Sequence, residues 1–171
     1  WGRGMSAVWP GGHRGVGVRL AGGEEILASA VLPATGQAAQ DSARAYLEAG
    51  MRAEPRPIAV GARIEHPRAL VDRARHGAWS QQLPAASYRL VAPRRGTQRQ
   101  GYTFCMCPGG LVIPASERVG HVVVNGMSSS QRGSRWSNAA VVVPVDARDF
   151  GSDDPWAGFR FRDAIEQRAW S

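Results

Sequence analysis

The sequence predicts an α/β chain that combines β-strands with several short helices. Residues 139–145 form a strongly β-branched run, which is typical of a central strand covered on both faces. Apolar residues alternate over 58–64, as they do in a strand with one buried face. Apolar residues recur at helical spacing over 38–49, after Pro67 and after Pro155, so helices and strands are mixed along the chain.

The first third of the chain is predicted to contain a hairpin and a short strand. The glycine-rich residues 1–15 are predicted to form a loop. The runs 16–20 and 25–27 are predicted to be two strands joined by a Gly-Gly turn. Residues 30–32 are predicted to be a short buried strand.

A helix and a domain boundary follow. The helix is predicted over 38–49, with Gly50 as its stop signal. The proline-rich stretch 54–57 is a break in composition. We therefore predict two domains, residues 1–54 and residues 55–171.

The second domain is predicted to contain two more helices and further strands. One helix should run from Pro67 to Gly77, and another should follow Asp154-Pro155. The helix positions expected to face the core are Leu70, Val71, Ala74, Phe161, Ala164, Ile165 and Ala169. The additional strands are predicted over 88–91, 102–106, 111–113 and 121–124, the last two as a pair.

The net charge of +7 is carried by arginine, because all 21 basic residues are arginines. They are scattered along the chain, and only Arg94 and Arg95 are adjacent. Nucleic-acid binding depends on clustered contacts to phosphates, so this pattern does not favour it.

The composition of the chain indicates its cellular location, and its two ends indicate whether it is a piece of a longer protein. No stretch approaches the roughly 18 apolar residues that cross a bilayer, and no signal peptide is recognisable, so we expect a cytoplasmic protein without a membrane partner. The chain begins with Trp1 rather than Met, and its last residues read as the middle of a helix. We therefore expect an internal piece of a longer protein.

Cys105 and Cys107 lie two residues apart on a predicted strand, which places their Cα atoms about 6.6 Å apart on one face. That separation is at the limit for a disulfide, so a redox pair requires a bend at Pro108 or at the glycines after it. No histidines are paired at metal-ligand spacing, and we predict no metal site. Gly109 and Gly110 should expose backbone N–H groups and leave room for a flat ligand.

Two further stretches carry polar groups suited to ligand binding. Arg63 and Glu65 share one face of their predicted strand, which allows them to pair. His66 is a candidate general base, but a lone histidine just before a helix is more often a cap or a surface residue. Asn125-Gly126 favours a hairpin turn. The small polar residues that follow this turn offer hydrogen bonds without bulk.

Together these stretches resemble one family, the bacterial uncharacterised FAD-dependent dehydrogenases. The matching blocks are Ala34-Thr35-Gly36, Gly61-Ala62-Arg63-Ile64-Glu65-His66-Pro67, Phe104-Cys105-Met106-Cys107-Pro108-Gly109-Gly110, Asn125-Gly126-Met127-Ser128 with Ser130 and Arg132, and Ser137-Asn138-Ala139-Ala140. They stand in the family's order and cover nearly the whole chain. The sequence departs from the family at Gln37, where a histidine is usual.

The resemblance implies an NAD(P)/FAD-dependent oxidoreductase with a two-dinucleotide-binding flavoprotein fold. Its substrate domain would be a mixed β-sheet flanked by helices. Residues 1–54 would be the end of the FAD-binding domain, and residues 55–171 most of a substrate domain truncated at its C-terminus. The family's N-terminal Gly-x-Gly-x-x-Gly segment is missing from this sequence, so the chain alone should hold FAD weakly or not at all and be inactive.

The resemblance also implies which residues meet the cofactor and the substrate. The cofactor-binding residues would be Ala34, Thr35, Gly36, Pro108, Gly109 and Gly110. The substrate-side residues would be Arg63, Asn125, Gly126, Met127, Ser128, Arg132 and Asn138, of which the two arginines suit an anionic group. No catalytic role is assigned, and the candidates are Cys105, Cys107 and His66. The flavin would exchange hydride with a small-molecule substrate of unknown identity.

Two other functions stay open at this point. A non-catalytic basic module that binds nucleic acid or a protein partner would show salt-sensitive affinity and no dependence on flavin. A thiol redox protein would lose its activity when Cys105 and Cys107 are both replaced by serine, whereas buried structural cysteines would only loosen packing.

Overall fold

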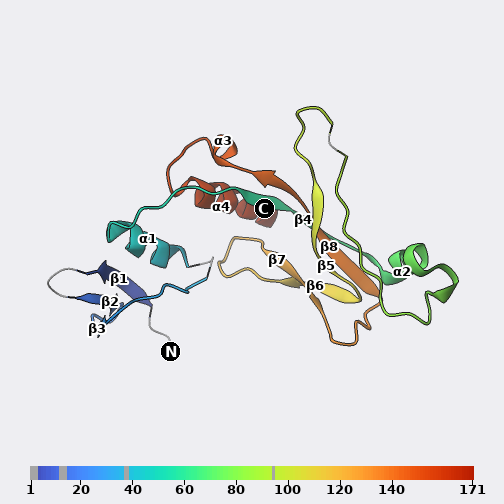
Figure 1. Ribbon diagram of the computed structural model, residues 1–171, viewed down its shortest axis with the longest axis horizontal. Coiled ribbons are helices and arrows are strands. Elements are labelled where there is room, and N and C mark those ends of the chain that lie inside the picture. The colour runs from blue at the N-terminus through green and yellow to red at the C-terminus, as the bar shows by residue number, and fades with distance from the viewer. Residues whose placement is uncertain (1–3, 12–14, 37–38, 94) are drawn as a thin grey trace. The chain divides into compact units, whose positions relative to one another are not determined.

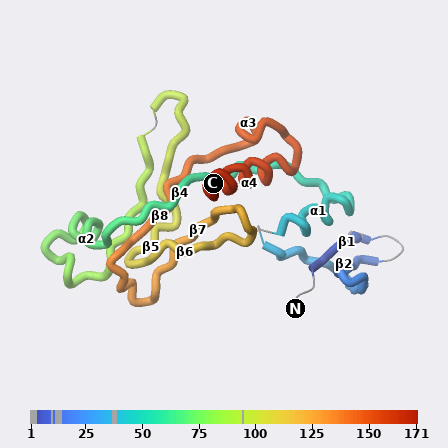
Figure 2. The backbone as a smooth tube through the Cα atoms, turned by 180° about the vertical axis from the view of Figure 1, so that it is seen from behind, coloured from blue at the N-terminus to red at the C-terminus, as the bar shows by residue number. Residues whose placement is uncertain are grey.

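The computed structural model describes residues 4–11, 15–36, 39–93 and 95–171, and the chain divides into two compact units, Trp1–Glu54 and Pro55–Ser171. Figure 1 shows the elements of each unit, and Figure 2 traces the same backbone from behind. The fold is α+β, and the mixture of helices and strands that the sequence predicts is confirmed. Among the described residues every strand pair is antiparallel.

The first unit contains a three-stranded sheet and one helix. The strands are β1 (Met5–Pro10), β2 (Val16–Leu20) and β3 (Glu25–Ala28), and the helix is α1 (Gln40–Glu48). The hairpin of β2 and β3 confirms the prediction for this region. The loop predicted over 1–15 is wrong for β1, because this strand pairs with β2 despite its flanking glycines. Residues 1–3 and 12–14 of that stretch lie outside the described residues.

Residues 30–32 do not form the buried strand that the sequence predicts. No described strand pairs with them, and the side chain of Leu32 is 89% exposed. The predicted helix is confirmed as α1, although Ala38 lies outside the described residues. The chain leaves α1 through Gly50, whose φ of 84° is a backbone conformation that favours glycine.

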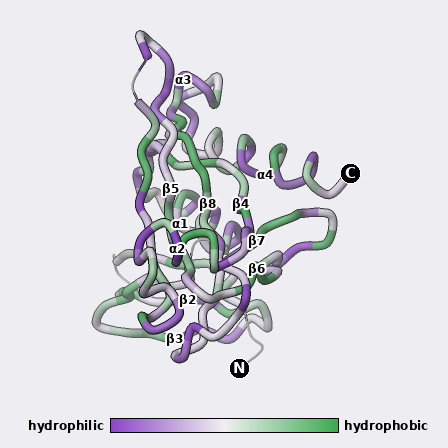
Figure 3. The backbone as a smooth tube through the Cα atoms, turned by 90° about the vertical axis from the view of Figure 1, so that its right-hand side faces the viewer, coloured by the Kyte–Doolittle hydropathy of each residue, from purple (hydrophilic) through white to green (hydrophobic). Residues whose placement is uncertain are grey.

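The second unit is built on β8 (Trp136–Val145). This strand lies between β4 (Ile58–Pro67) and β5 (Tyr102–Cys107) in a three-stranded sheet. Figure 3 shows the hydrophobic stretch along β8, and several of its apolar side chains are buried. The central strand predicted over 139–145 is therefore confirmed.

Pro67 ends β4 instead of starting a helix as predicted. The helix α2 (Arg68–His76) begins one residue later, and a short 3₁₀ turn, Gly77–Trp79, follows it. Gly77 ends α2 as predicted, with a φ of 56°. The extended backbone that precedes α2 brings His66 into the strand.

The inward face predicted for α2 is wrong. The side chain of Leu70 is 58% exposed, whereas Asp72 is buried. The Asp72 carboxylate accepts a 2.8 Å hydrogen bond from the Ala86 N–H and pairs with Arg68 at 3.1 Å. This hydrogen bond attaches α2 to the loop that follows it. The buried face of α2 therefore carries a polar side chain, where the sequence pattern predicts apolar side chains.

The strand predicted over 88–91 is reduced to a single bridge between Val91 and Tyr102. The Leu90 N–H donates to the Thr103 hydroxyl at 2.7 Å, and the Thr103 N–H donates to the Leu90 carbonyl at 2.8 Å. This segment therefore lies alongside β5, but a side-chain hydroxyl replaces one partner of a regular ladder.

The strands β6 (Gly110–Pro114) and β7 (Val124–Ser128) form a two-stranded sheet that contacts β5 and β8. The strand predicted over 111–113 is confirmed as β6. Its predicted partner over 121–124 is wrong except at Val124, because the pairing register lies further along the chain. The turn predicted at Asn125-Gly126 is wrong for the same reason, since both residues lie within β7.

The second unit ends in α3 (Ala147–Phe150), which the sequence does not predict, and α4 (Ala157–Trp170), which it does. The Asp146 carboxylate caps α3 and accepts from the Arg148 N–H at 3.0 Å. Hydrogen bonds from Arg148 lower the pKa of Asp146 to about 2, so the cap is charged at neutral pH. On α4 the predicted inward positions Ala164, Ile165 and Ala169 are exposed. None of the described helices is long and apolar enough to cross a membrane.

Candidate functional site

Segments far apart in the sequence meet around the guanidinium of Arg63. We define the Arg63 cluster as Arg63 on β4, Cys107 at the end of β5, Gly126 on β7 and Asn138 on β8. The strand pairing explains the meeting, because β4 and β5 flank β8 and bring Cys107 opposite Asn138. Every member of this cluster belongs to a block that stands out in the sequence, but the sequence does not show that these residues touch.

Asn138 is fully buried at the centre of the cluster, with 0% exposure. Its Oδ1 accepts a 2.6 Å hydrogen bond from Arg63 Nη1. Its Nδ2 is buried and has no hydrogen-bond partner within the described ranges. An unpaired buried donor is unfavourable by about 1–3 kcal/mol, so this amide group is a costly feature of the cluster.

Arg63 brings a positive charge that no described carboxylate neutralises. Its Nη1 also donates to the Cys105 carbonyl at 3.0 Å and lies 3.9 Å from Cys107 Sγ. The pairing with Glu65 that the sequence allows does not form, because the Glu65 carboxylate accepts from the Val112 N–H at 3.3 Å. A guanidinium with neutral neighbours and spare N–H groups suits an anionic ligand.

Position 126 of β7 requires a glycine, because no larger residue fits against the Arg63 cluster. A Cβ at this position would overlap Arg63 Nη1 and Asn138 Oδ1 and would lie 2.7 Å from Cys107 Sγ. Ser128 shares this face of the strand. The two other predicted substrate-side residues of β7, Asn125 and Met127, are exposed and lie on the alternate positions.

Pro108, Gly109 and Gly110 are buried in the turn from β5 to β6. A Cβ on Gly109 would overlap the Arg132 carbonyl, and one on Gly110 would lie 2.5 Å from a backbone oxygen of β7. The Gly109 N–H donates to Ser137 Oγ at 3.0 Å. The chain itself fills the space beside these glycines, which the sequence analysis expects to be open. Their contact with a flavin stays a prediction.

A β-bulge separates the two cysteines. Phe104 pairs with Ala140 and Cys107 pairs with Asn138, so β5 carries one extra residue, and Cys105 has a φ of 45°. Both thiols are free. The regular strand spacing assumed from the sequence therefore does not hold between them, and their chemical roles stay predictions.

His66, the candidate general base, contacts a tyrosine that the sequence analysis does not single out. Its Nε2 lies 2.9 Å from the Tyr88 hydroxyl, and the two rings are 5.5 Å apart. Burial raises the pKa of Tyr88, so the hydroxyl keeps its proton at neutral pH. One tyrosine in a short apolar run carries no sequence signal of this contact.

Arg132 contributes its backbone to this region, while its side chain is exposed. Its φ is 50°, and its carbonyl accepts a 3.2 Å hydrogen bond from Arg68 Nη1. Sequence spacing does not reveal this contact with Arg68, because the two residues come from separate elements.

The predicted flavin contacts Ala34, Thr35 and Gly36 belong to the first unit and are exposed. Gly36 has a φ of 81°, and a Cβ there would meet nothing within 4 Å. Thr35 Oγ1 lies 3.5 Å from the Tyr46 hydroxyl. An open backbone of this kind allows close approach of a ligand. Gln37, the departure from the family pattern, lies outside the described residues.

A second polar cluster brings His121, Asp163 and Glu166 together, with ligand atoms within 4.8 Å of one another. Arg118 pairs with Asp163 at 2.5 Å, and Arg162 pairs with Glu166 at 3.2 Å. Two guanidinium groups already neutralise these carboxylates. The arrangement is therefore that of an ion-pair network that ties α4 to the loop before β7.

The chain is similar to a protein family and to a longer relative. Residues 57–171 match a family described as FAD-dependent protein, C-terminal domain-like. An uncharacterized protein from Clostridium beijerinckii (strain ATCC 51743 / NCIMB 8052) is 34% identical over 150 residues, which cover 86% of this chain. The chain spans about 28% of the length of that relative.

Proposed function

The chain belongs to the family of FAD-dependent proteins through residues 57–171, and we propose that it is part of an FAD-dependent oxidoreductase of the dehydrogenase type. Residues 1–54 are the end of an FAD-binding domain, and residues 55–171 are most of a substrate domain. The division of the chain between Glu54 and Pro55 supports this assignment, as does the greater length of the relative.

The observation that carries the proposal is the Arg63 cluster. Family-like blocks that are separated in the sequence meet there around the guanidinium of Arg63. This group has no described carboxylate partner, keeps N–H donors for a ligand, and is held by the buried amide of Asn138. Such donors converge where a protein binds an oxygen-bearing or anionic group.

These donors fit the chemistry of a flavin or of an anionic substrate beside it. The flavin ring carries carbonyl oxygens on one edge, which accept hydrogen bonds from amide and guanidinium N–H groups. In the first unit, Thr35 and Gly36 offer an exposed backbone for close contact with FAD. The fit of the donors supports FAD as the cofactor.

In the proposed reaction, bound FAD supplies hydride exchange with a small substrate. Arg63 binds the anionic group of the substrate and fixes its orientation. Asn138, which is fully buried, accepts a 2.6 Å hydrogen bond from Arg63 and holds the guanidinium in place. The Tyr88 hydroxyl, 2.9 Å from His66 Nε2, holds a proton at the edge of β4. No protein nucleophile is required.

The proposal is tested by expressing the complete reading frame that contains this chain. We expect the purified protein to be yellow and to release FAD on denaturation. The 171-residue chain alone should take up little FAD, because its sequence contains no Gly-x-Gly-x-x-Gly loop between a strand and a helix. Absorption spectra recorded before and after dialysis against FAD measure the flavin content of the complete protein and of the 171-residue chain.

The matched control replaces Cys105 and Cys107 with serine in the complete protein. Retained flavin and retained flavin reduction agree with the proposal, whereas a loss of turnover with full FAD content would favour thiol chemistry instead. A complete protein that stays colourless after reconstitution with FAD would exclude the proposed function.

A further inference from the structure

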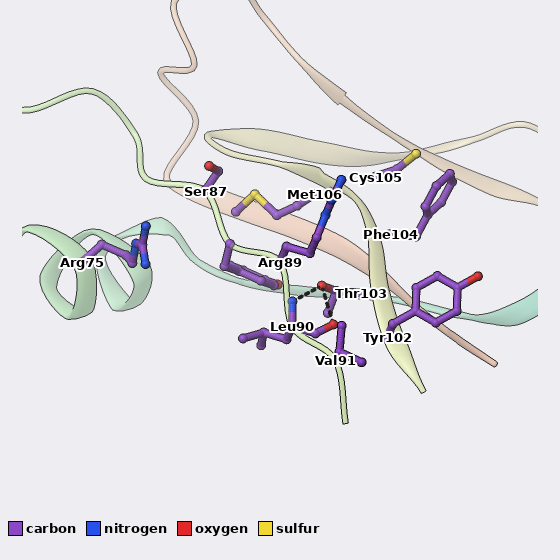
Figure 4. Close-up of a pocket in the computed structure, with 11 residues that line it drawn as sticks. Arg75, Ser87, Arg89, Leu90, Val91, Tyr102, Thr103, Phe104, Cys105 and Met106 are labelled. Carbon is purple, nitrogen blue, oxygen red and sulfur yellow. Dashed lines mark hydrogen bonds between the residues drawn. The ribbon is translucent and has the colours of Figure 1, made fainter. Parts of the chain in front are cut away.

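A pocket of about 1170 Å³ lies in the second unit between β5 and the segment 87–91. Figure 4 shows Arg75 of α2 at one end of it, Tyr102 and Phe104 of β5 at the other, and Arg89 between them. Small-molecule sites typically enclose about 300–1,000 Å³, so this pocket is large enough for a ring system with substituents.

The walls of the pocket offer aromatic and apolar surface. The side chain of Phe104 is 57% exposed, and that of Leu90 is 60% exposed. The hydroxyl of Tyr88 is engaged with His66, so this tyrosine offers its ring rather than its polar group. Phe104 is exposed and Tyr102 is half-buried, and both line the pocket, so they favour a planar ligand that stacks on them.

The pocket is also positively charged. Arg75 and Arg89 line it, and none of its lining residues is acidic. Neither arginine has a hydrogen-bond or ion-pair partner in the part of the chain that the structure describes. The Thr103 hydroxyl is already bonded to Leu90, so the two guanidinium groups are the strongest free polar groups here.

We propose that this pocket binds a planar anionic small molecule, with its ring against Phe104 and Tyr102 and its carboxylate or phosphate on Arg89. The proposal goes beyond the proposed function, because the pocket shares none of its lining residues with the Arg63 cluster. The two sites adjoin at Cys105, which lines the pocket and whose carbonyl accepts from Arg63.

The test measures binding of naphthalene carboxylate to the 171-residue chain by calorimetry, with the neutral naphthalene carboxamide as the matched probe. The carboxylate should bind and the amide should bind at least about tenfold more weakly, since one charge-assisted hydrogen bond is worth about 1.5–3 kcal/mol. Arg89→Gln should weaken carboxylate binding by a similar factor. Arg168→Gln removes an exposed arginine of α4 outside the pocket and should leave binding unchanged.

Competition with flavin mononucleotide distinguishes two sources of the same chemistry. Displacement of the carboxylate identifies a flavin-type ligand, and binding without displacement identifies a substrate-type aromatic acid. Equal binding of the amide, equal effects of Arg89→Gln and Arg168→Gln, or no binding of either probe would overturn the proposal. None of these outcomes depends on FAD in the complete protein, so failure here is separable from failure of the proposed function.

Discussion

Replacing Gly109 with alanine is expected to lower the free energy of unfolding of the second unit by about 2–5 kcal/mol. The added Cβ would overlap the Arg132 carbonyl, and the φ of 56° at this position is unfavourable for alanine. Overpacking against backbone adds about 1–3 kcal/mol to that strain. Urea denaturation followed by tryptophan fluorescence measures the loss, since Trp136 lies in the same unit.

The matched control is Gly151→Ala. Gly151 has a similar φ of 72°, but nothing lies within 4 Å of its added Cβ. This variant carries the backbone strain alone, about 1–2 kcal/mol. Equal losses at Gly109 and Gly151 would contradict the close approach of the Arg132 backbone to the turn before β6.

Replacing Arg63 with methionine is expected to lower the free energy of unfolding by about 2–4 kcal/mol. The change removes the donors to Asn138 Oδ1 and to the Cys105 carbonyl while it keeps an apolar stem of similar length. Asn138 is then buried with neither end of its amide paired. Each buried polar group left without a partner is unfavourable by about 1–3 kcal/mol. Chemical denaturation of the 171-residue chain measures the effect.

A double-mutant cycle separates the Arg63–Asn138 contact from other effects. Asn138→Leu removes the buried amide, so the double variant should lose clearly less than the sum of the two single variants. Arg168→Met, on the exposed face of α4, controls for the loss of one charge and should change stability little. Additive losses at Arg63 and Asn138 would contradict the hydrogen bond between them.

The sequence predicts well those elements whose local pattern agrees with their tertiary surroundings. The β-branched run of β8 and the hairpin of β2 and β3 are of this kind. Asn125-Gly126 is different, because its local pattern indicates a turn while the crowded contact with Arg63 requires glycine in a strand. The apolar positions of α2 also mislead, since Asp72 takes the buried position by bonding a distant N–H.

In the candidate site, too, the sequence predicts some features and tertiary contacts determine the others. Arg63, Cys107 and Asn138 can be singled out from the sequence because they lie in unusual blocks. Their meeting depends on the order β4–β8–β5, which single-sequence patterns do not determine. Arg89 and Tyr88 carry no motif at all. The pocket that they line arises only because Leu90 bonds Thr103 and holds their segment beside β5.

The most direct test of the central claim is the absorption spectrum of the flavin in the complete protein during titration with acetate. A small non-aromatic anion should bind at Arg63 and shift the flavin band saturably, whereas neutral acetamide should not. Arg63→Gln should retain FAD and lose the shift, and Arg168→Gln should keep both. A shift of the same size and midpoint in Arg63→Gln and in the unchanged protein would contradict the claim that the Arg63 cluster binds an anion beside the flavin.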